Sequence, residues 1–304
     1  MKTLLVGYRA ADLDKKSLAG DVTCFCLDIY HRHAIEKVHH AKAVCAAHLP
    51  SGAWDLIKFR TGPKLMSGEL ALDLLQECAA LAKACGAKVE LDFTGRERDK
   101  NDLWDKVFGK AARTRTFTAT YQASVPGGKV LTLASVPGCF CHRRTDEGGL
   151  ALAETVARDL KSRTDRIRLL DMGCGNGLVG FLVASAVPAI DLVMVDSHAR
   201  AVEAATLNAE KLGCPAEVIL ADSGTPARLD GTFDVFAGNP PYYSEYRIAE
   251  VFYETALRAL KPGGTCYMVC KNAAGLEPVA KQYFSDLELV PRRGYSVLKA
   301  SKTS

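Results

Sequence analysis

Two short segments in the second half of the chain contain residue types that can bind a ligand and support a reaction. They are Asp171-Met-Gly-Cys-Gly-Asn-Gly177 and Asn239-Pro-Pro-Tyr242. The first lies between two apolar runs, a pattern typical of a buried strand, a tight turn and the start of a helix. Glycines let a ligand approach bare backbone, and a helix start offers unpaired N–H groups. The first segment is therefore a candidate ligand loop, although a plain tight turn would look similar.

The spacing of the three glycines excludes two familiar phosphate-binding loops. Gly173, Gly175 and Gly177 form G-x-G-x-G, whereas a dinucleotide loop has G-x-G-x-x-G. A P-loop needs a lysine followed by Ser or Thr, and Leu178-Val179 stands at that place. A carboxylate at Asp171 would repel phosphate and suits a ligand with an ammonium group. S-adenosylmethionine (SAM) has an amine and a sulfonium and lacks phosphate.

Further polar residues follow the next predicted strands, and parallel strands end at one edge of a sheet. Asp196 stands 25 residues after Asp171 and can accept both hydroxyls of a ribose, while Asp222 can reach an adenine amino group. The alternatives are a helix cap for Asp196 and an ordinary turn acid for Asp222. The candidate cofactor residues are Asp171, Gly173, Gly175, Asn176, Gly177, Asp196, Ser197, Asp222, Ser223 and Asn239.

The segment Asn239-Pro-Pro-Tyr242 is difficult to explain as structure alone. Two prolines fix φ and stiffen the loop, which holds the flanking asparagine and tyrosine at the rim of the same edge. A plain Pro-Pro turn needs neither of these neighbours. The candidate catalytic residues are Asn239, Pro240, Pro241 and Tyr242.

The elements that must position these residues alternate between strand and helix, which indicates a mostly parallel, doubly wound α/β sheet. In the second half we predict strands at 169–171, 191–196, 217–222, 233–238 and 265–270, helices at 150–160, 198–212 and 248–260, and a closing antiparallel hairpin at 287–290 and 295–299. In the first half we predict strands at 3–7, 22–28, 54–59 and 88–93, helices at 67–85 and 99–108, and a hairpin at 121–125 and 129–135.

The two halves repeat this layout, which favours an internal duplication with domains at 1–135 and 136–304. The alternative is that any two such domains align by layout alone. The first half has Gly7-Tyr-Arg-Ala-Ala-Asp12 at the place of the glycine loop and Lys58-Phe-Arg60 at the place of the asparagine loop. It therefore lacks both candidate loops.

Over residues 136–304 these motifs resemble class I SAM-dependent methyltransferases. The glycine loop, Asp196, Asp222 and the turn Leu260-Lys-Pro-Gly-Gly264 carry the resemblance. Asn239-Pro-Pro-Tyr242 is similar to the catalytic loop of the subset that methylates planar nitrogens. The resemblance implies SAM as cofactor and two tandem Rossmann-like domains, of which the C-terminal one is active.

An exocyclic amine is a poor nucleophile because its lone pair is conjugated into the ring. In this resemblance, the Asn239 side-chain oxygen and the Pro240 carbonyl accept its two hydrogens and draw the nitrogen toward tetrahedral geometry. Tyr242 stacks on the flat group. The sulfonium supplies the electrophile, so the protein mainly aligns and desolvates the reactants.

A closer resemblance, over nearly the whole chain, is to the ribosomal RNA guanine-N2 methyltransferases of the small subunit methyltransferase C type. It rests on the order of the two domains and on the segment 137–149, although that family often has Phe where Tyr242 stands. It implies ribosomal RNA as partner, with the target guanine unstacked into the pocket. The first domain would position RNA. Its candidate phosphate contacts, which can equally form a solvated helix face, are Arg96, Arg98, Lys100, Lys106, Lys110, Arg113 and Arg115; loop cations at 142–144 and 292–293 are further candidates.

Composition is compatible with this interpretation. Residues 1–135 hold 20 Lys and Arg against 15 Asp and Glu, and the remainder holds 19 against 20. The odd number of cysteines, 11, and their apolar surroundings indicate reduced thiols. Cys139-Phe-Cys141-His142 lacks a second ligand pair, so no metal is expected. The chain shows neither a membrane span nor a signal peptide, which predicts a cytoplasmic protein; its oligomeric state stays open.

Three other functions remain possible from the sequence. A protein glutamine N5-methyltransferase shares the Asn-Pro-Pro-Tyr loop but usually carries a small helical front domain. A DNA adenine-N6 methyltransferase is the second. The third is a non-catalytic RNA-binding or assembly protein, against which the intact loop at Asn239 argues.

Overall fold

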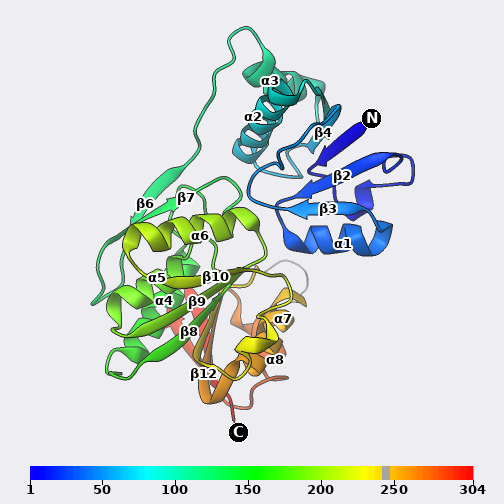
Figure 1. Ribbon diagram of the computed structural model, residues 1–304. Helices are drawn as coiled ribbons and strands as arrows, with labels where there is room; N and C mark the ends of the chain where they lie inside the picture. Colours follow the sequence, from blue (N-terminus) through cyan, green and yellow to red (C-terminus); the bar gives the residue numbers. More distant parts are fainter. Residues whose placement is uncertain (242–246, 304) are drawn as a thin grey trace. The chain divides into compact units, whose positions relative to one another are not determined.

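The computed structural model describes residues 1–241 and 247–303, which form two compact units (Figure 1). The first unit comprises Met1–Thr118, Val136–Gly138 and His198–Arg200, and the second comprises Ala119–Ser135, Cys139–Ser197 and Ala201–Ser304. The segment Ala119–Ser135, which the sequence analysis placed at the end of the first domain, is thus grouped with the second unit.

The first unit contains a five-stranded parallel sheet with the strand order β3-β2-β1-β4-β5. Its elements are β1 (Lys2–Val6), a 3₁₀ turn (Ala10–Asp12), β2 (Asp21–Cys26), α1 (Ile29–His39), β3 (Lys42–Cys45), β4 (Leu56–Thr61), α2 (Gly68–Cys85), β5 (Lys88–Phe93) and α3 (Glu97–Phe108). Helix α2 begins and ends where the sequence predicts. The Ser67 hydroxyl accepts a hydrogen bond from the Leu70 N–H, and Gly86 ends the helix with φ +77°.

The second unit contains a seven-stranded sheet with the order β10-β9-β8-β11-β12-β14-β13. Its strands are β8 (Ile167–Met172), β9 (Ile190–Asp196), β10 (Ala216–Leu220), β11 (Phe233–Gly238), β12 (Leu260–Cys270), β13 (Leu287–Arg292) and β14 (Tyr295–Ser301). Its helices are α4 (Glu147–Leu160), α5 (Leu178–Ala186), α6 (Ala199–Leu212), α7 (Arg247–Ala259), α8 (Ala273–Ala280) and a 3₁₀ turn (Ala227–Leu229). A separate two-stranded hairpin pairs β6 (Ala119–Ala123) with β7 (Leu131–Ser135).

The second sheet is covered on both faces, as its nearly continuous apolar strands predict. Along β8, Ile167 and Leu169 belong to the core that includes α4 and α5, whereas Leu170 and Met172 belong to the core that includes α7 and α8. Alternate residues of a strand point to opposite faces, so β8 supplies both cores. The predicted class of fold is confirmed: a mostly parallel α/β sheet that closes with an antiparallel hairpin.

Some elements differ from the sequence prediction. Strand β10 ends at Leu220, so Asp222 lies two residues beyond the strand that it was expected to end. Leu260-Lys-Pro-Gly-Gly264 is part of β12 and not a turn before it, because the extra residues form a bulge between the Phe233–Leu260 and Val235–Thr265 pairs. Helix α8 was not predicted, because Pro278 inside it reads as a helix breaker.

Candidate active site at the edge of the second sheet

Four neighbouring strands place the predicted residues at one edge of the second sheet. Strands β10, β9, β8 and β11 are parallel, so their carboxyl ends point the same way. The register aligns Met172 with Val195 and with Gly238, and it aligns Leu220 with Asp196. The glycine loop, Asp196, Asp222 and Asn239 follow these aligned ends directly or within two residues. Between β8 and β11 the chain order reverses, which is the usual position of a ligand crevice in such sheets.

The backbone favours glycine at all three positions of the loop, but the space around the three glycines differs. Gly173, Gly175 and Gly177 have φ values of +69°, +56° and +87°, which side chains rarely adopt. A Cβ atom at Gly177 would lie 2.3 Å from the Phe181 ring, and one at Gly173 would lie 2.9 Å from the Phe252 ring. A Cβ atom at Gly175 would meet nothing within 4 Å. Gly175 therefore borders open space, where a ligand can approach the backbone.

Asp196 is tied to this loop. Its Oδ2 atom accepts a hydrogen bond from the Gly175 N–H at 2.8 Å, and its backbone carbonyl accepts one from Ala221 at 3.0 Å. The residue is half-buried at the end of β9. A carboxylate in this position has further lone pairs that can accept hydroxyl hydrogens from a ligand above Gly175.

The side chain of Asp171 lies under the loop and not on its surface. It is 2% exposed and accepts a hydrogen bond at 2.9 Å from the Gly180 N–H in the first turn of α5. Burial, with the nearby charge of Asp196, raises the pKa of Asp171 to about 7. Asp171 therefore supports the helix start and adds a buried acidic group behind the loop.

Asn176 is also turned away from the surface, toward the hairpin of β6 and β7. It is 5% exposed, exchanges hydrogen bonds with the Tyr121 hydroxyl and donates to the Ala134 carbonyl at 2.8 Å. Asn208, on α6, is fully buried and completes this network. Its side chain accepts from the Ala134 N–H at 2.8 Å and donates to the carbonyls of Ala134 and Asn176 at 2.9 and 3.0 Å. Nothing in the sequence pattern singles out Asn208, since a single asparagine in a helix usually faces solvent.

The remaining predicted cofactor residues lie beyond β9 and β10. Ser197 follows Asp196 directly and is half-buried. Asp222 is half-buried and Ser223 is exposed, in the segment that follows β10. Ser197, Asp222 and Ser223 are thus within the same row of strand ends as the glycine loop.

Asn239 follows the last residue of β11, and its side chain contacts an acid from a distant part of the sequence. The Asn239 amide nitrogen donates to Asp146 Oδ2 at 2.6 Å. Asp146 is the N-cap of α4 and also accepts from the N–H groups of Gly148 and Gly149 at 3.0 and 2.9 Å. Burial raises the pKa of Asp146, while these three donors oppose the rise. Sequence analysis missed this contact, because 93 residues separate the two side chains.

The rest of the candidate catalytic loop is only partly described. Pro240 is buried and Pro241 is half-buried. Tyr242 lies outside the described residues, so its expected stacking role is a prediction only. The structure thus brings Asn239 and Pro240 to the same edge as the glycine loop.

In the first sheet, the place that corresponds to the glycine loop, directly after β1, is crowded by other residues of the first unit. A Cβ atom at Gly7, after β1, would lie 2.4 Å from the carbonyl oxygen of Arg60 in β4. The Arg60 guanidinium pairs with Asp92 at 2.7 Å and with Asp12 at 3.1 Å. Gly7 therefore lacks the open space that borders Gly175.

The basic residues suggested for RNA contact are partly engaged with acids. On α3, Arg96 pairs with Asp99 at 2.9 Å and Lys100 pairs with Glu97 at 3.4 Å. On the β13–β14 hairpin, Arg293 pairs with Glu154 at 2.8 Å. The two pairs on α3 are largely exposed, and such pairs are weak, so they do not prevent phosphate binding; they are equally consistent with a solvated helix face.

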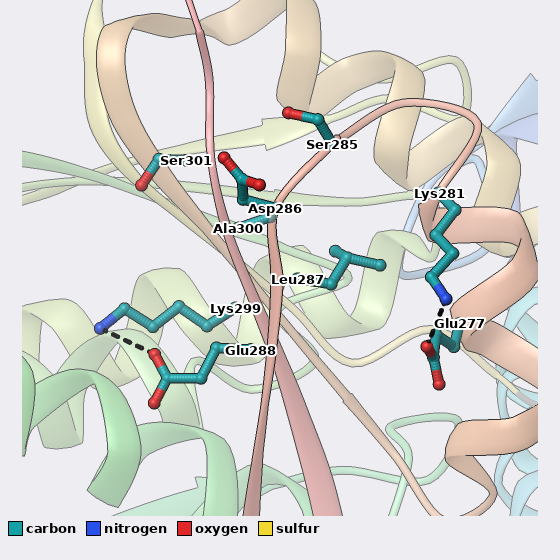
Figure 2. A pocket seen from close by; sticks show the side chains of 9 residues that line it. All are labelled: Glu277, Lys281, Ser285, Asp286, Leu287, Glu288, Lys299, Ala300 and Ser301. Atoms are coloured by element: carbon teal, nitrogen blue, oxygen red, sulfur yellow. Dashed lines mark ion pairs between the residues drawn. The ribbon is translucent and has the colours of Figure 1, made fainter.

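A separate hollow of about 560 Å³ lies beside α8 and the β13–β14 hairpin (Figure 2). Its walls carry the ion pairs Lys281–Glu277 at 2.7 Å and Lys299–Glu288 at 3.7 Å. None of the predicted site residues lines it. Across residues 1–241 and 247–303, no group of three or more His, Cys, Asp or Glu side chains is arranged to hold a metal ion, and no helix is long and apolar enough to cross a membrane.

A comparison with models of protein families places this chain in one of them. Residues 130–299 match the model of the family described as "Methyltransferase small domain". Because the match covers more than half of the chain, the protein belongs to this family.

Two relatives of known name are similar to this chain. The chain is 28% identical over 184 residues to a ribosomal RNA small subunit methyltransferase C of Haemophilus influenzae (strain PittGG), a match that covers 59% of this chain and 53% of that protein. It is 28% identical over 271 residues to a ribosomal RNA large subunit methyltransferase G of Ectopseudomonas mendocina, with 86% and 63% covered. The chain thus spans about half the length of the first of these relatives and less than two thirds of the second.

One solved structure is similar over nearly the full chain. It is the T. thermophilus 16S rRNA N2 G1207 methyltransferase in complex with AdoMet and guanosine, with a TM-score of 0.78, 20% identity, and coverage of 99% of this chain and 88% of that one. At this identity the similarity concerns the fold.

Proposed function

We propose that this protein is a SAM-dependent N-methyltransferase that acts on RNA, and that its target atom is guanine N2 of ribosomal RNA. The observation that carries the proposal is the placement of Gly175, Asp196 and Asn239 at one edge of the second sheet. The relatives are named as methyltransferases of ribosomal RNA, and one structure of similar fold contains AdoMet with guanosine. These similarities support RNA as the class of substrate.

The residues present fit SAM. Gly175 leaves open space above the loop, and Asp196 has lone pairs for the two ribose hydroxyls. Asp222 and Ser223 lie further along the same edge for the adenine amine. Bound SAM supplies an electrophilic methyl group on a sulfonium. In this proposal the Asp171 carboxylate attracts that positive charge from beneath the loop. Asn176 holds the loop in shape through its hydrogen bonds. Neither side chain needs to contact the ligand.

At the reacting nitrogen the protein works as a hydrogen-bond acceptor. The Asn239 side-chain oxygen and the Pro240 carbonyl accept the two hydrogens of the exocyclic amine, which offsets the positive charge that develops on nitrogen during attack. The rigid prolines preserve this geometry. A strong general base is unnecessary, since the methylated amine releases its proton to solvent. Tyr242 is proposed to stack on the base.

We also propose that the two units arose by duplication and that the first serves to position RNA. The first five strands of each sheet have the same order, since β3-β2-β1-β4-β5 corresponds to β10-β9-β8-β11-β12. The ion pairs of Arg60 occupy the edge of the first sheet where a cofactor would otherwise lie. A parallel α/β first unit also differs from the small helical front domain of glutamine methyltransferases.

The test is transfer of labelled methyl groups from SAM to ribosomal RNA and to assembled subunits, followed by mass mapping of the modified nucleoside. We expect N2-methylguanosine at one position. Asn239→Ala should lower turnover at least 100-fold while SAM affinity changes less than threefold. Equal losses of both would contradict the catalytic role of Asn239. Absence of transfer to any RNA, with SAM still bound, would favour a non-catalytic RNA-binding protein.

A further inference from the structure

A polar contact beside the candidate catalytic loop is not explained by the requirements of the fold. Asp146 already caps α4, and both of its oxygens accept backbone N–H groups there. The additional hydrogen bond from Asn239, at 2.6 Å, is the shortest of the three that the Asp146 carboxylate accepts. It joins the start of α4 to the end of β11, within the second unit.

The chemistry of this contact determines the orientation of the Asn239 amide. An amide has one donor end and one acceptor end, and these are hard to distinguish by shape. An ionised carboxylate only accepts hydrogen bonds. Burial raises the pKa of Asp146, but three donors converge on its carboxylate, from Gly148, Gly149 and Asn239, and they favour the ionised form. The carboxylate therefore holds the NH₂ end of Asn239 and keeps the oxygen at the other end of the amide.

We propose that Asp146 is a positioning residue for methyl transfer, an inference that rests on the proposed function. By holding the NH₂ end of Asn239, Asp146 presents the amide oxygen to the hydrogens of the substrate amine. Without this constraint the amide can rotate, and its NH₂ end would then face the amine and repel its hydrogens. A favourable acceptor would become an unfavourable donor at the nitrogen on which positive charge develops.

The deciding variant is Asp146→Ser, in full-length protein. Serine is also a good N-cap, so α4 keeps its cap, but the shorter side chain cannot reach Asn239. We expect kcat to fall 10- to 100-fold, while the KM for SAM stays within twofold. Ser67→Ala, which removes the N-cap of α2 in the first unit, is the matched control for stability and should leave kcat unchanged.

A double variant separates positioning from general destabilisation. If Asp146 acts through Asn239, Asp146→Ser should reduce kcat little further in an Asn239→Ala background. Independent effects that multiply would refute the proposal, as would a single Asp146→Ser variant with kcat within twofold of the wild type.

A readout without catalysis tests the contact itself. The side-chain NH₂ resonances of Asn239, assigned by their loss in Asn239→Ala, should be well separated in the wild type and should converge in Asp146→Ser. Unchanged resonances would overturn the proposed contact. Wild-type protein that methylates no RNA would refute the proposed function together with this role, whereas active wild type with fully active Asp146→Ser would refute only the role of Asp146.

Discussion

Replacement of Asn208 by alanine should destabilise the second unit strongly, although Asn208 lies on a helix and contacts no candidate ligand. The side chain is fully buried and makes three hydrogen bonds. After truncation the Ala134 N–H loses its acceptor and the Asn176 carbonyl loses its donor, while the Ala134 carbonyl keeps its bond from Asn176. Each buried group left unsatisfied costs about 1–3 kcal/mol. With two such groups and a gain of up to about 0.7 kcal/mol from helix propensity, we expect a net loss of about 1–5 kcal/mol.

The assay must report on the second unit alone. Both tryptophans, Trp54 and Trp104, lie in the first unit, so their fluorescence in urea follows that unit. Hydrogen exchange of peptides from β8 and β9 follows the second unit, because buried strands exchange through global or subglobal opening. Asn208→Ala should accelerate exchange in β8 and β9 and leave the fluorescence transition in place.

Two comparison variants make this prediction specific. Thr206→Ala changes an exposed position of the same helix and should alter stability by less than about 0.5 kcal/mol. Asn208→Asp keeps the shape but replaces two donors by a carboxylate that faces two carbonyls, so it should destabilise at least as much as alanine. A stable Asn208→Asp variant, or exchange in Asn208→Ala that matches the wild type, would refute the reasoning.

Three further outcomes are expected. Gly175→Ala and Gly213→Ala introduce similar backbone strain, because the two glycines have φ +56° and +58° and no atom lies near the new Cβ. Both variants should lose about 1 kcal/mol of stability. Calorimetry should show weaker SAM binding only for Gly175→Ala. The folded-state pKa of Asp171, about 7, exceeds its ordinary value of 3.8, so ionisation of Asp171 lowers the free energy of unfolding progressively as pH rises from about 4 to about 7. Asp171→Asn should remove this decrease, which amounts to about 1–4 kcal/mol at neutral pH. Urea titrations of the ligand-free protein measure it. Burial raises the pKa of the Cys174 and Cys266 thiols, so iodoacetamide at pH 8 should leave both unmodified until the protein unfolds, and mass spectrometry that finds either one labelled in the folded protein would contradict this expectation.

The sequence alone determined those features that depend on neighbouring residues. The caps of α2 at Ser67 and Gly86, the glycine loop after β8 and the alternation of strands and helices are local patterns, and the structure contains each of them. Since parallel strands share one carboxyl edge, the gathering of Asp196 and Asn239 at that edge also followed from the order of elements.

Only the tertiary structure decided what individual polar side chains do at that edge. Asn176 was expected to bind cofactor, yet its side chain bonds Tyr121 and the β7 backbone, 55 and 42 residues away in the sequence. Asp146 contacts Asn239 across 93 residues. A side chain's type and its neighbours in sequence do not specify which distant backbone or amide it will meet, because that depends on how sheet, helix and hairpin pack together. The succession of strands and helices along the chain was therefore predictable, and the hydrogen-bond partners were not.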